Sequence, residues 1–285
     1  MLRTIEKVTT IYFSPCGNAE KIAKVIADRF GKNLQIPVTY VDVTLPENRT
    51  ETLYFAHSDL VVFCVPVYAG RIPNKILPAV QSLFLGNQTM VVPIVTFGNR
   101  SFDSGLKELC FELNKNDFLP VGAAAFVSEH SFSADLAAGR PDEADVAMMH
   151  EFADTVMEKI KKAQDSCPLD VQKIFLDIDQ IPGNYPLDRY YTPLGTDGKP
   201  AIFLKAKPKT DLKSCVKCGV CTSNCPMGAI VQENPYNVTG ICIKCQACIK
   251  KCPNGAKYFD DEAFLSHVKM LEETYKRKAE YSLFL

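Results

Sequence analysis

The chain has 285 residues, of which 47% are hydrophobic, so it can bury a sizeable core, and its length favours two domains. Its formal net charge of −1 gives no overall attraction to nucleic acid, and no apolar run reaches the roughly 18 residues of a membrane span. The start, MLRTIEKVTTIYF, lacks signal-peptide features, and 12 cysteines in such a chain favour metal or redox use over disulfides, so we expect a cytoplasmic protein.

The N-terminal half alternates predicted strands and helices. Strands are expected at 8–13, 38–43, 60–65, 90–96 and 121–127, and helices at 22–30, 73–84, 102–116 and 142–162. Gly31 stands where the first helix is expected to end. This alternation predicts a doubly wound parallel sheet, whose ligands bind beyond the carboxyl ends of its strands.

Three loops follow predicted strands and are candidates for binding. Between the first strand and its helix lies Ser14-Pro15-Cys16-Gly17-Asn18-Ala19, and its hydroxyl, small residue and glycine at a helix start predict an anion site. The second and third loops are Pro66-Val67-Tyr68-Ala69-Gly70 and Thr96-Phe97-Gly98-Asn99-Arg100. All three are expected at one edge of the sheet.

Other candidates in this half have simpler explanations. His130 follows the fifth strand, and it could act as a catalytic residue with Arg100 or make a structural hydrogen bond. Cys64 lies in an apolar strand and is expected to pack in the core. Cys16 is expected at a helix N-terminus, which lowers a thiol's pKa, but a structural role is favoured over a redox one.

Residues 164–210 are expected to form an ordered linker. The segment contains six prolines and several aromatic rings, a composition unlike that of a flexible tether. Because long ordered loops often act as lids, part of it is expected to cover the ligand or to line a cleft between domains.

Two cysteine runs give the most specific signal. Cys215, Cys218, Cys221 and Cys225 form a C-x2-C-x2-C-x3-C-P pattern. Cys242, Cys245, Cys248 and Cys252 repeat it, and Gly-Ala follows each run in the same place, after Met227 and Asn254 respectively. A pair of zinc sites is the alternative, but zinc ligands come as separated C-x2-C pairs and need no third cysteine or Cys-Pro. The duplication therefore predicts two [4Fe–4S] clusters.

The spacing also predicts which cysteines share a cluster. Three thiolates from one tight loop surround one cubane, and the cysteine before the proline turns to the other cubane. We expect one cluster on Cys215, Cys218, Cys221 and Cys252. The other is expected on Cys242, Cys245, Cys248 and Cys225.

Charge is unevenly distributed. Nine lysines but only Asp211 and Glu233 lie between Lys205 and Phe259. These lysines either offset the negative clusters, or they dock this domain on the acidic N-terminal half or on an acidic partner protein. The tail at 260–285 has the apolar spacing of an amphipathic helix and is expected to support the cluster domain.

The loop at 14–20 resembles the FMN-phosphate signature of flavodoxins, S-x-T-G-N-T followed by an acid. With two ferredoxin motifs behind it, the chain resembles the flavodoxin–ferredoxin fusion proteins of anaerobic bacteria and archaea. This resemblance implies a flavodoxin-like five-stranded parallel sheet of order 2-1-3-4-5 at 1–163 and a 2[4Fe–4S] ferredoxin-like domain at 211–259.

The same resemblance implies that residues 14–19 hold the FMN phosphate and that residues 66–70 and 96–100 flank the flavin ring. Tyr68 would stack on the ring, and Asn99 would hydrogen-bond nearby. Cys16 and Ala19 depart from the signature, where the family has threonine and a hydroxyl residue. Two side-chain phosphate donors are thereby lost or weakened, although the backbone N–H groups remain.

Together these features predict electron transfer among two clusters and FMN. One hypothesis is a carrier that serves a separate, acidic redox partner. A second is a reductase of a small substrate bound over the flavin, with His130 and Arg100 in its pocket. A third is a ferredoxin whose flavodoxin-like domain holds no flavin. No G-x-G-x-x-G follows a strand, so a dedicated NAD(P)H site is not visible.

Overall fold

The computed structural model describes residues 4–164 and 174–285. Cys167 and the first part of the predicted linker lie outside these residues. Strand β1 (Lys7–Tyr12), strand β2 (Val38–Asp42), strand β4 (Asp59–Pro66), strand β6 (Thr89–Phe97) and strand β8 (Ala123–Val127) form one parallel sheet. Their spatial order is β2-β1-β4-β6-β8. Counted along the chain, these five strands have the order 2-1-3-4-5, which confirms the flavodoxin-like fold.

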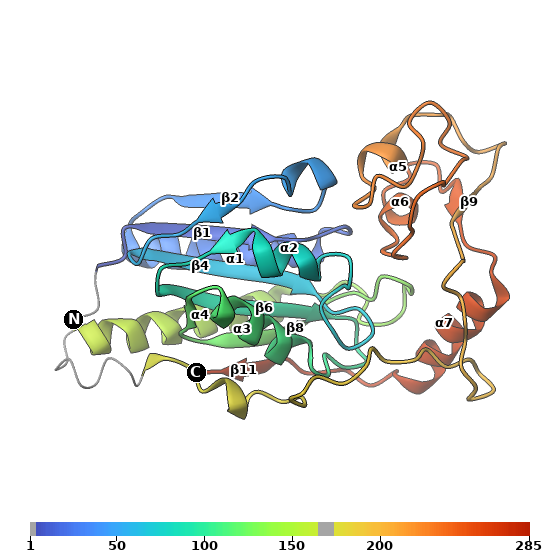
Figure 1. The fold of residues 1–285 in the computed structure, drawn as a ribbon. Coiled ribbons are helices and arrows are strands. Elements are labelled where there is room, and N and C mark those ends of the chain that lie inside the picture. Colours follow the sequence, from blue (N-terminus) through green and yellow to red (C-terminus); the bar gives the residue numbers. More distant parts are fainter. Residues whose placement is uncertain (1–3, 165–173) are drawn as a thin grey trace.

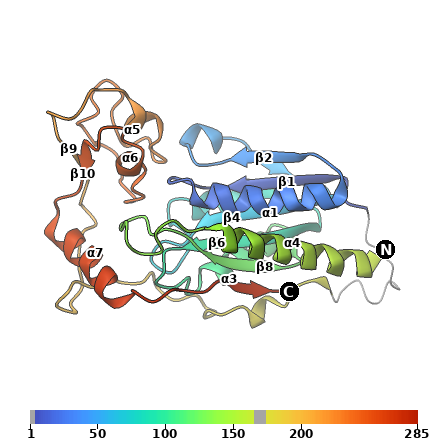
Figure 2. The same ribbon diagram turned by 180° about the vertical axis from the view of Figure 1, so that it is seen from behind.

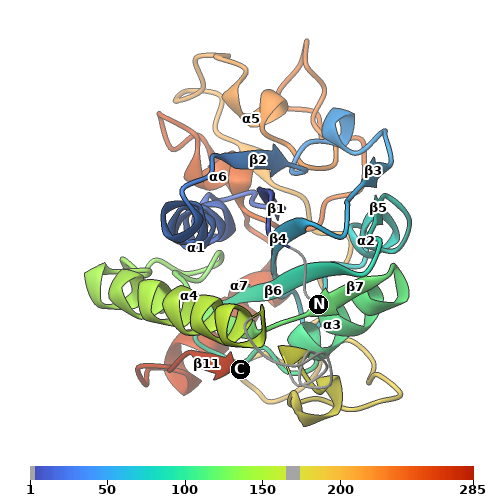
Figure 3. The same ribbon diagram turned by 90° about the vertical axis from the view of Figure 1, so that its left-hand side faces the viewer.

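Helices cover both faces of the sheet. Helix α1 (Asn18–Leu34) and helix α4 (Glu143–Gln164) lie together on one face, and helix α2 (Leu77–Ser82) and helix α3 (Gly105–Lys115) lie on the other (Figures 2 and 3). All nine residues of β6 are buried, because it is a central strand covered on both sides. Each face has its own apolar core, the first built around Ile26 and Phe152 and the second around Phe63 and Leu109.

The predicted bounds of two helices, α1 and α2, are wrong. Helix α1 continues through Gly31 and ends at Leu34, followed by Gln35 in the left-handed region. Gly31 serves a close approach instead, since a Cβ there would lie 2.6 Å from the Val38 side chain. Helix α2 is shorter than the expected 73–84: its first turn begins only at Leu77, and the short strand β5 (Phe84–Leu85) follows it.

The short strands lie at the periphery. Strand β3 (Leu53–Tyr54) pairs with β5 in a separate two-stranded sheet, and strand β7 (Phe118–Pro120) joins β6 at its start. These short strands leave the order of the five parallel strands unchanged.

The cysteine-rich part lies beyond the carboxyl ends of the sheet strands (Figure 1). It contains helix α5 (Val220–Ser223), helix α6 (Ala247–Lys250) and a two-stranded sheet of strand β9 (Lys209–Thr210) and strand β10 (Lys257–Tyr258). Ligands of a doubly wound sheet bind at this same edge, so the two parts meet where the candidate loops are.

The tail differs from the expected single helix. Helix α7 (Glu262–Thr274) forms as predicted, and Phe264 packs against Phe259 and Phe203 of the cysteine-rich part and linker. The chain then returns to the large sheet, where strand β11 (Ser282–Phe284) pairs antiparallel with β8. The tail thus ties the two parts together. None of the helices in the described residues is long and apolar enough to cross a membrane.

Candidate functional site

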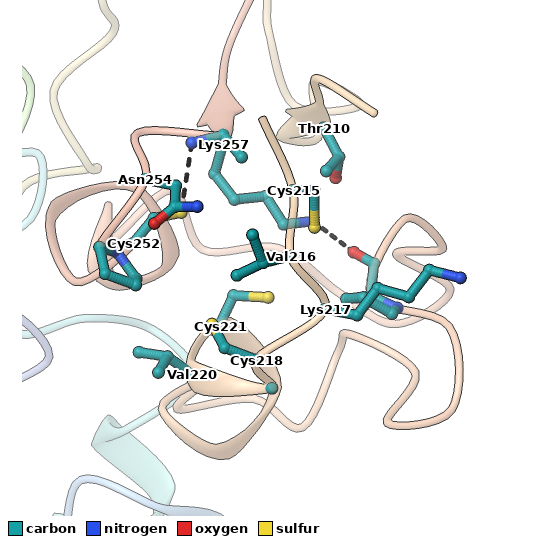
Figure 4. A pocket seen from close by; sticks show the side chains of 14 residues that line it. Thr210, Cys215, Val216, Lys217, Cys218, Val220, Cys221, Cys252, Asn254 and Lys257 are labelled. Atoms are coloured by element: carbon teal, nitrogen blue, oxygen red, sulfur yellow. Dashed lines mark hydrogen bonds between the residues drawn. The ribbon is translucent and has the colours of Figure 1, made fainter. Parts of the chain in front are cut away.

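The cysteines gather in two groups of four. Cys215, Cys218, Cys221 and Cys252, the first cysteine group, line one cavity (Figure 4). Cys225, Cys242, Cys245 and Cys248, the second cysteine group, line another. Each group combines three cysteines of one run with the last cysteine of the other. Within the described residues, no three His, Cys, Asp or Glu side chains converge closely enough to hold a single metal ion.

The surroundings of both groups suit thiolate ligands. The Ala229 N–H donates to Cys225 Sγ at 3.3 Å, and the Ala256 N–H donates to Cys252 Sγ at 3.2 Å. Hydrogen bonds to sulfur stabilise the anionic form and tune cluster potentials. Burial raises the pKa of Cys248 to about 12, so this thiol stays neutral until a metal replaces its proton. The donor set therefore fits [4Fe–4S] clusters.

The first loop surrounds a small cavity of about 70 Å³, here called the loop cavity. Ser14 Oγ accepts a hydrogen bond from the Glu20 N–H at 2.9 Å, and Gly17 precedes α1 with φ of 93° and no side-chain cap. Ser14 thus occupies the Glu20 amide, and the amides of Asn18 and Ala19 at the start of α1 remain to bind an anion such as a phosphate. Asn18 donates its side-chain amide to the Glu129 carbonyl at 3.1 Å. The loop therefore offers backbone donors chiefly.

Cys16 has a role that sequence patterns did not reveal. Its Sγ donates to the backbone carbonyl of Cys245 at 3.0 Å, which joins the first loop to the second cysteine group. Burial raises the pKa of this thiol, whereas the helix N-terminus led us to expect a lowered value. Cys16 is thus an interdomain contact and remains a thiol.

A larger cavity of about 520 Å³, here called the interdomain cavity, lies between the two parts. The second and third loops form one wall and the linker another. The cysteine-rich part and α7 close it. The lining includes Val67, Tyr68, Ala69, Gly70, Phe97, Gly98, Arg100, Tyr190, Tyr191, Phe203, Cys242, Lys244 and His267. It shares Val67, Tyr68, Phe97, Gly98, His130 and Ser131 with the loop cavity, so the two cavities are adjacent.

Two adjacent cavities of this kind fit FMN, which needs a phosphate cradle beside an apolar space for its ring. Pro66 and Thr96 line the loop cavity, at the ends of β4 and β6. Tyr68 lines both cavities, and burial together with the neighbouring Cys245, Cys16 and Cys242 raises its pKa. This tyrosine therefore lies between the cavities and the second cysteine group. Its stacking on a flavin stays a prediction.

Arg100 lies in the wall of the interdomain cavity. Its guanidinium pairs with Asp103 and lies 4.2 Å above the centre of the Tyr191 ring. Arg71 anchors the same part of the linker, because it pairs with buried Glu108 and donates to the Asp188 carbonyl. These two cations hold the linker tyrosines over the cavity.

The predicted role of Asn99 beside the flavin needs correction. Its side-chain amide nitrogen donates to the carbonyls of Tyr275 and Arg277, at 2.6 and 2.7 Å, and its oxygen accepts from the Ala279 N–H at 3.1 Å. Both polar atoms of the side chain thus bind the tail, and Asn99 lines neither the loop cavity nor the interdomain cavity. The Asn99 side chain therefore binds the tail and not a flavin.

His130 lines both cavities. Its Nδ1 accepts from the Phe132 N–H at 3.0 Å, which is the structural hydrogen bond considered above. Gly98 allows this close approach, because a Cβ there would lie 2.4 Å from His130 Cδ2. Burial lowers the pKa of His130 to about 4, and the nearby positive charges of His267, Lys250 and Arg100 act in the same direction. His130 is therefore neutral near pH 7.

This shift predicts a pH-dependent stability. The unfolded chain binds a proton at His130 below about pH 6.5, but the folded chain does so only near pH 4, so stability falls as pH drops through this window. Between about pH 7 and 5 the loss should be about 2 kcal/mol. His130→Gln keeps an acceptor for the Phe132 N–H. It should remove this contribution to the pH dependence of the free energy of unfolding, as measured by anaerobic urea unfolding. Equal slopes for both proteins would contradict the assignment.

The remaining cysteines behave as core residues. Cys64 and Cys110 are fully buried in β4 and α3, and burial raises the pKa of both well above its ordinary value. The linker tyrosines Tyr190 and Tyr191 were missed as site residues. Their aromatic rings in a proline-rich segment were the signal, but only the fold shows which wall they form.

Comparison with known proteins found one family model and several solved structures that are similar to parts of this chain. A 4Fe-4S binding domain model matches residues 208–231. Solved structures with similarity include a flavodoxin 2 from Bacillus cereus, with 17% identity over 54% of this chain and 99% of that chain, at a TM-score of 0.38. A flavodoxin from Streptococcus pneumonia TIGR4 shares 17% identity over 53% and 98% of the chains, at 0.37. A flavodoxin from the domain Archaea shares 11% over 54% and 99%, at 0.38.

No curated protein matches the chain. The TM-scores are low, so the flavodoxin-like fold rests on the strand order described above. Strand order and domain match agree with the expected flavodoxin–ferredoxin fusion.

Proposed function

We propose that this iron–sulfur flavoprotein passes single electrons between two [4Fe–4S] clusters and FMN, as a carrier for a separate redox protein in the cytoplasm. The contact between Cys16 and the Cys245 carbonyl supports this proposal most directly, since it joins the FMN-phosphate loop to a cluster-ligand loop. Cys242 also lines the interdomain cavity, where the flavin ring would lie. The second cysteine group would therefore hold the cluster next to the flavin.

Few charges connect the two parts. Lys250 pairs with Glu129 at 2.6 Å, and Arg49 donates to the Pro226 carbonyl at 2.8 Å. Besides Lys250, only Lys209 of the nine lysines at 205–259 pairs with a carboxylate of the described chain, namely Asp260. The exposed lysines of the cysteine-rich part that have no carboxylate partner are thus available to an external partner.

The first cysteine group lies at the outer end of the molecule. Cys218 is exposed, and Leu212 and Val216 beside it are 65% and 64% exposed. Lys213 and Lys217 flank them and are exposed as well. An apolar surface flanked by lysines next to a cluster is suited to bind an acidic one-electron carrier protein, which would cover the apolar side chains.

Anaerobically purified chain should contain about eight irons, eight labile sulfides and one FMN. A reduced acidic ferredoxin should then reduce the FMN in stopped-flow absorbance measurements. Val216→Glu should slow this second-order reaction by about tenfold and leave reduction by dithionite unchanged, because it puts a like charge at the docking face. Leu265→Glu, at an exposed apolar site on α7, is the matched control and should react as the wild type does.

Two other outcomes would decide against the carrier. Full iron without FMN would favour a ferredoxin with a flavin-free docking domain. Equal rates for Val216→Glu and wild type, with rapid turnover of a small electron acceptor, would favour a reductase. That second candidate rests on the interdomain cavity, where Arg100 and His130 both lie in the lining.

A further inference from the structure

The two cysteine runs share their backbone conformation as well as their sequence pattern. Left-handed residues recur at matching places, in the pairs Lys217 and Lys244, Gly219 and Gln246, and Gly228 and Gly255. The alanine that follows Gly228, and likewise the alanine that follows Gly255, donates its N–H to the last cysteine of its run. The next residue therefore occupies an equivalent place beside each cysteine group.

These equivalent residues differ in charge. The first run has Ile230, which is 7% exposed and lines the cavity of the second cysteine group. The second run has Lys257, which is 3% exposed and lines the cavity of the first cysteine group. The duplication is thus broken by one buried positive charge.

Lys257 extends across the first cysteine group. In Figure 4 its side chain runs from the Cys252 side of the cavity toward the Cys215 side. Its ammonium donates to the Pro235 carbonyl and forms no ion pair with a carboxylate of the described residues. A buried ammonium is costly unless a negative charge lies near. A cubane with its four thiolates would supply that charge.

The other lysines near the cysteine groups are less buried than Lys257. Lys217 and Lys244 stand at matching places and line one cavity each, but Lys217 is exposed and Lys244 is half-buried, with its ammonium bound to the Leu204 and Cys242 carbonyls. Lys250 and Lys251 are exposed, where water screens their charge, and they bind Glu129 and Asn224. Lys257 is the buried cation that favours one cluster over the other.

We propose that Lys257 raises the reduction potential of the cluster held by the first cysteine group, an inference that rests on the proposed function. Reduction adds one electron to that cluster, breaks no bond and takes up no proton, and the fixed ammonium stabilises the added negative charge. An electron on the cluster pair is thereby drawn toward the exposed end of the molecule, where a partner protein would meet it.

The test is an anaerobic redox titration followed by electron paramagnetic resonance. Lys257→Ile introduces the residue found at the matching place of the first run. It should lower the midpoint potential of the first cluster by about 59 mV, which is a tenfold change in the equilibrium constant of a one-electron reduction. Ile230→Lys is the reciprocal variant and should raise the potential of the second cluster. Repeating Lys257→Ile in a Cys225→Ala background, which lacks the second cluster, assigns the shifted signal to the first cluster.

A Lys257→Ile protein with full iron and unchanged potentials would overturn the inference. Wild-type protein with fewer than about eight irons would instead count against the proposed function, so the two failures are distinguishable. If Lys257→Ile does not retain its iron, Lys257→Gln keeps a donor for Pro235 without the charge, and it should show the same fall in potential. An unchanged potential there would also overturn the inference.

Discussion

The double variant Cys215→Ala/Cys252→Ala should retain about four irons, whereas Cys215→Ala/Cys225→Ala should retain almost none. The reason is the crosswise arrangement of the two groups. Cys215 and Cys252 line the same cavity although they belong to different runs, and Cys225 lines the other. When two ligands of one cluster are removed, only that cluster is lost. When one ligand of each cluster is removed, both clusters are lost. Iron and labile-sulfide assays on anaerobically purified protein measure the result.

Cys64→Ala is the matched control, because Cys64 is a core thiol of β4 far from either group in sequence and should leave the iron content at about eight. The opposite pattern would contradict the crosswise assignment: retention in Cys215→Ala/Cys225→Ala and loss in Cys215→Ala/Cys252→Ala would mean that each run closes its own cluster. Far-ultraviolet circular dichroism should show an unchanged N-terminal sheet in every variant.

Asn99→Ala should lower the free energy of unfolding by about 3 kcal/mol. The side chain is 3% exposed and satisfies two carbonyls and one N–H of the tail. Each buried backbone group left without a partner costs roughly 1–3 kcal/mol, and water can reach part of this segment. Urea unfolding at a constant FMN concentration measures the loss. Hydrogen exchange of β11 should rise with it, because the tail leads directly into that strand.

Asn114→Ala is a suitable comparison, since Asn114 makes a single side-chain hydrogen bond, to the Phe118 carbonyl at 3.1 Å. Its loss should be about 1 kcal/mol. If Asn99→Ala weakened FMN binding while the exchange of β11 stayed at the wild-type rate, the side chain would serve the flavin, as the sequence first suggested, and its assignment to the tail would be wrong.

Much of the fold followed from local patterns. The five parallel strands were expected from buried apolar runs, and β1, β2, β4, β6 and β8 lie within a few residues of those positions. The cysteine groups followed from spacing, because ligands two residues apart on a tight loop can reach one cluster whatever lies around it. Helix α7 followed from the helical spacing of Phe264, Val268 and Leu271.

Contacts between distant segments were decided only by the tertiary structure. Cys16 and Cys245 lie 229 positions apart, and no local pattern indicates that a loop thiol meets that carbonyl. Asn99 follows a strand end, as a ligand-binding residue would, yet its amide turns to the tail that β11 brings alongside. The charge of Lys257 is visible in the sequence, whereas its burial depends on β10 pairing with β9. Periodicity and ligand spacing determine which elements form, but side-chain direction and the packing of one part on the other determine which residues meet.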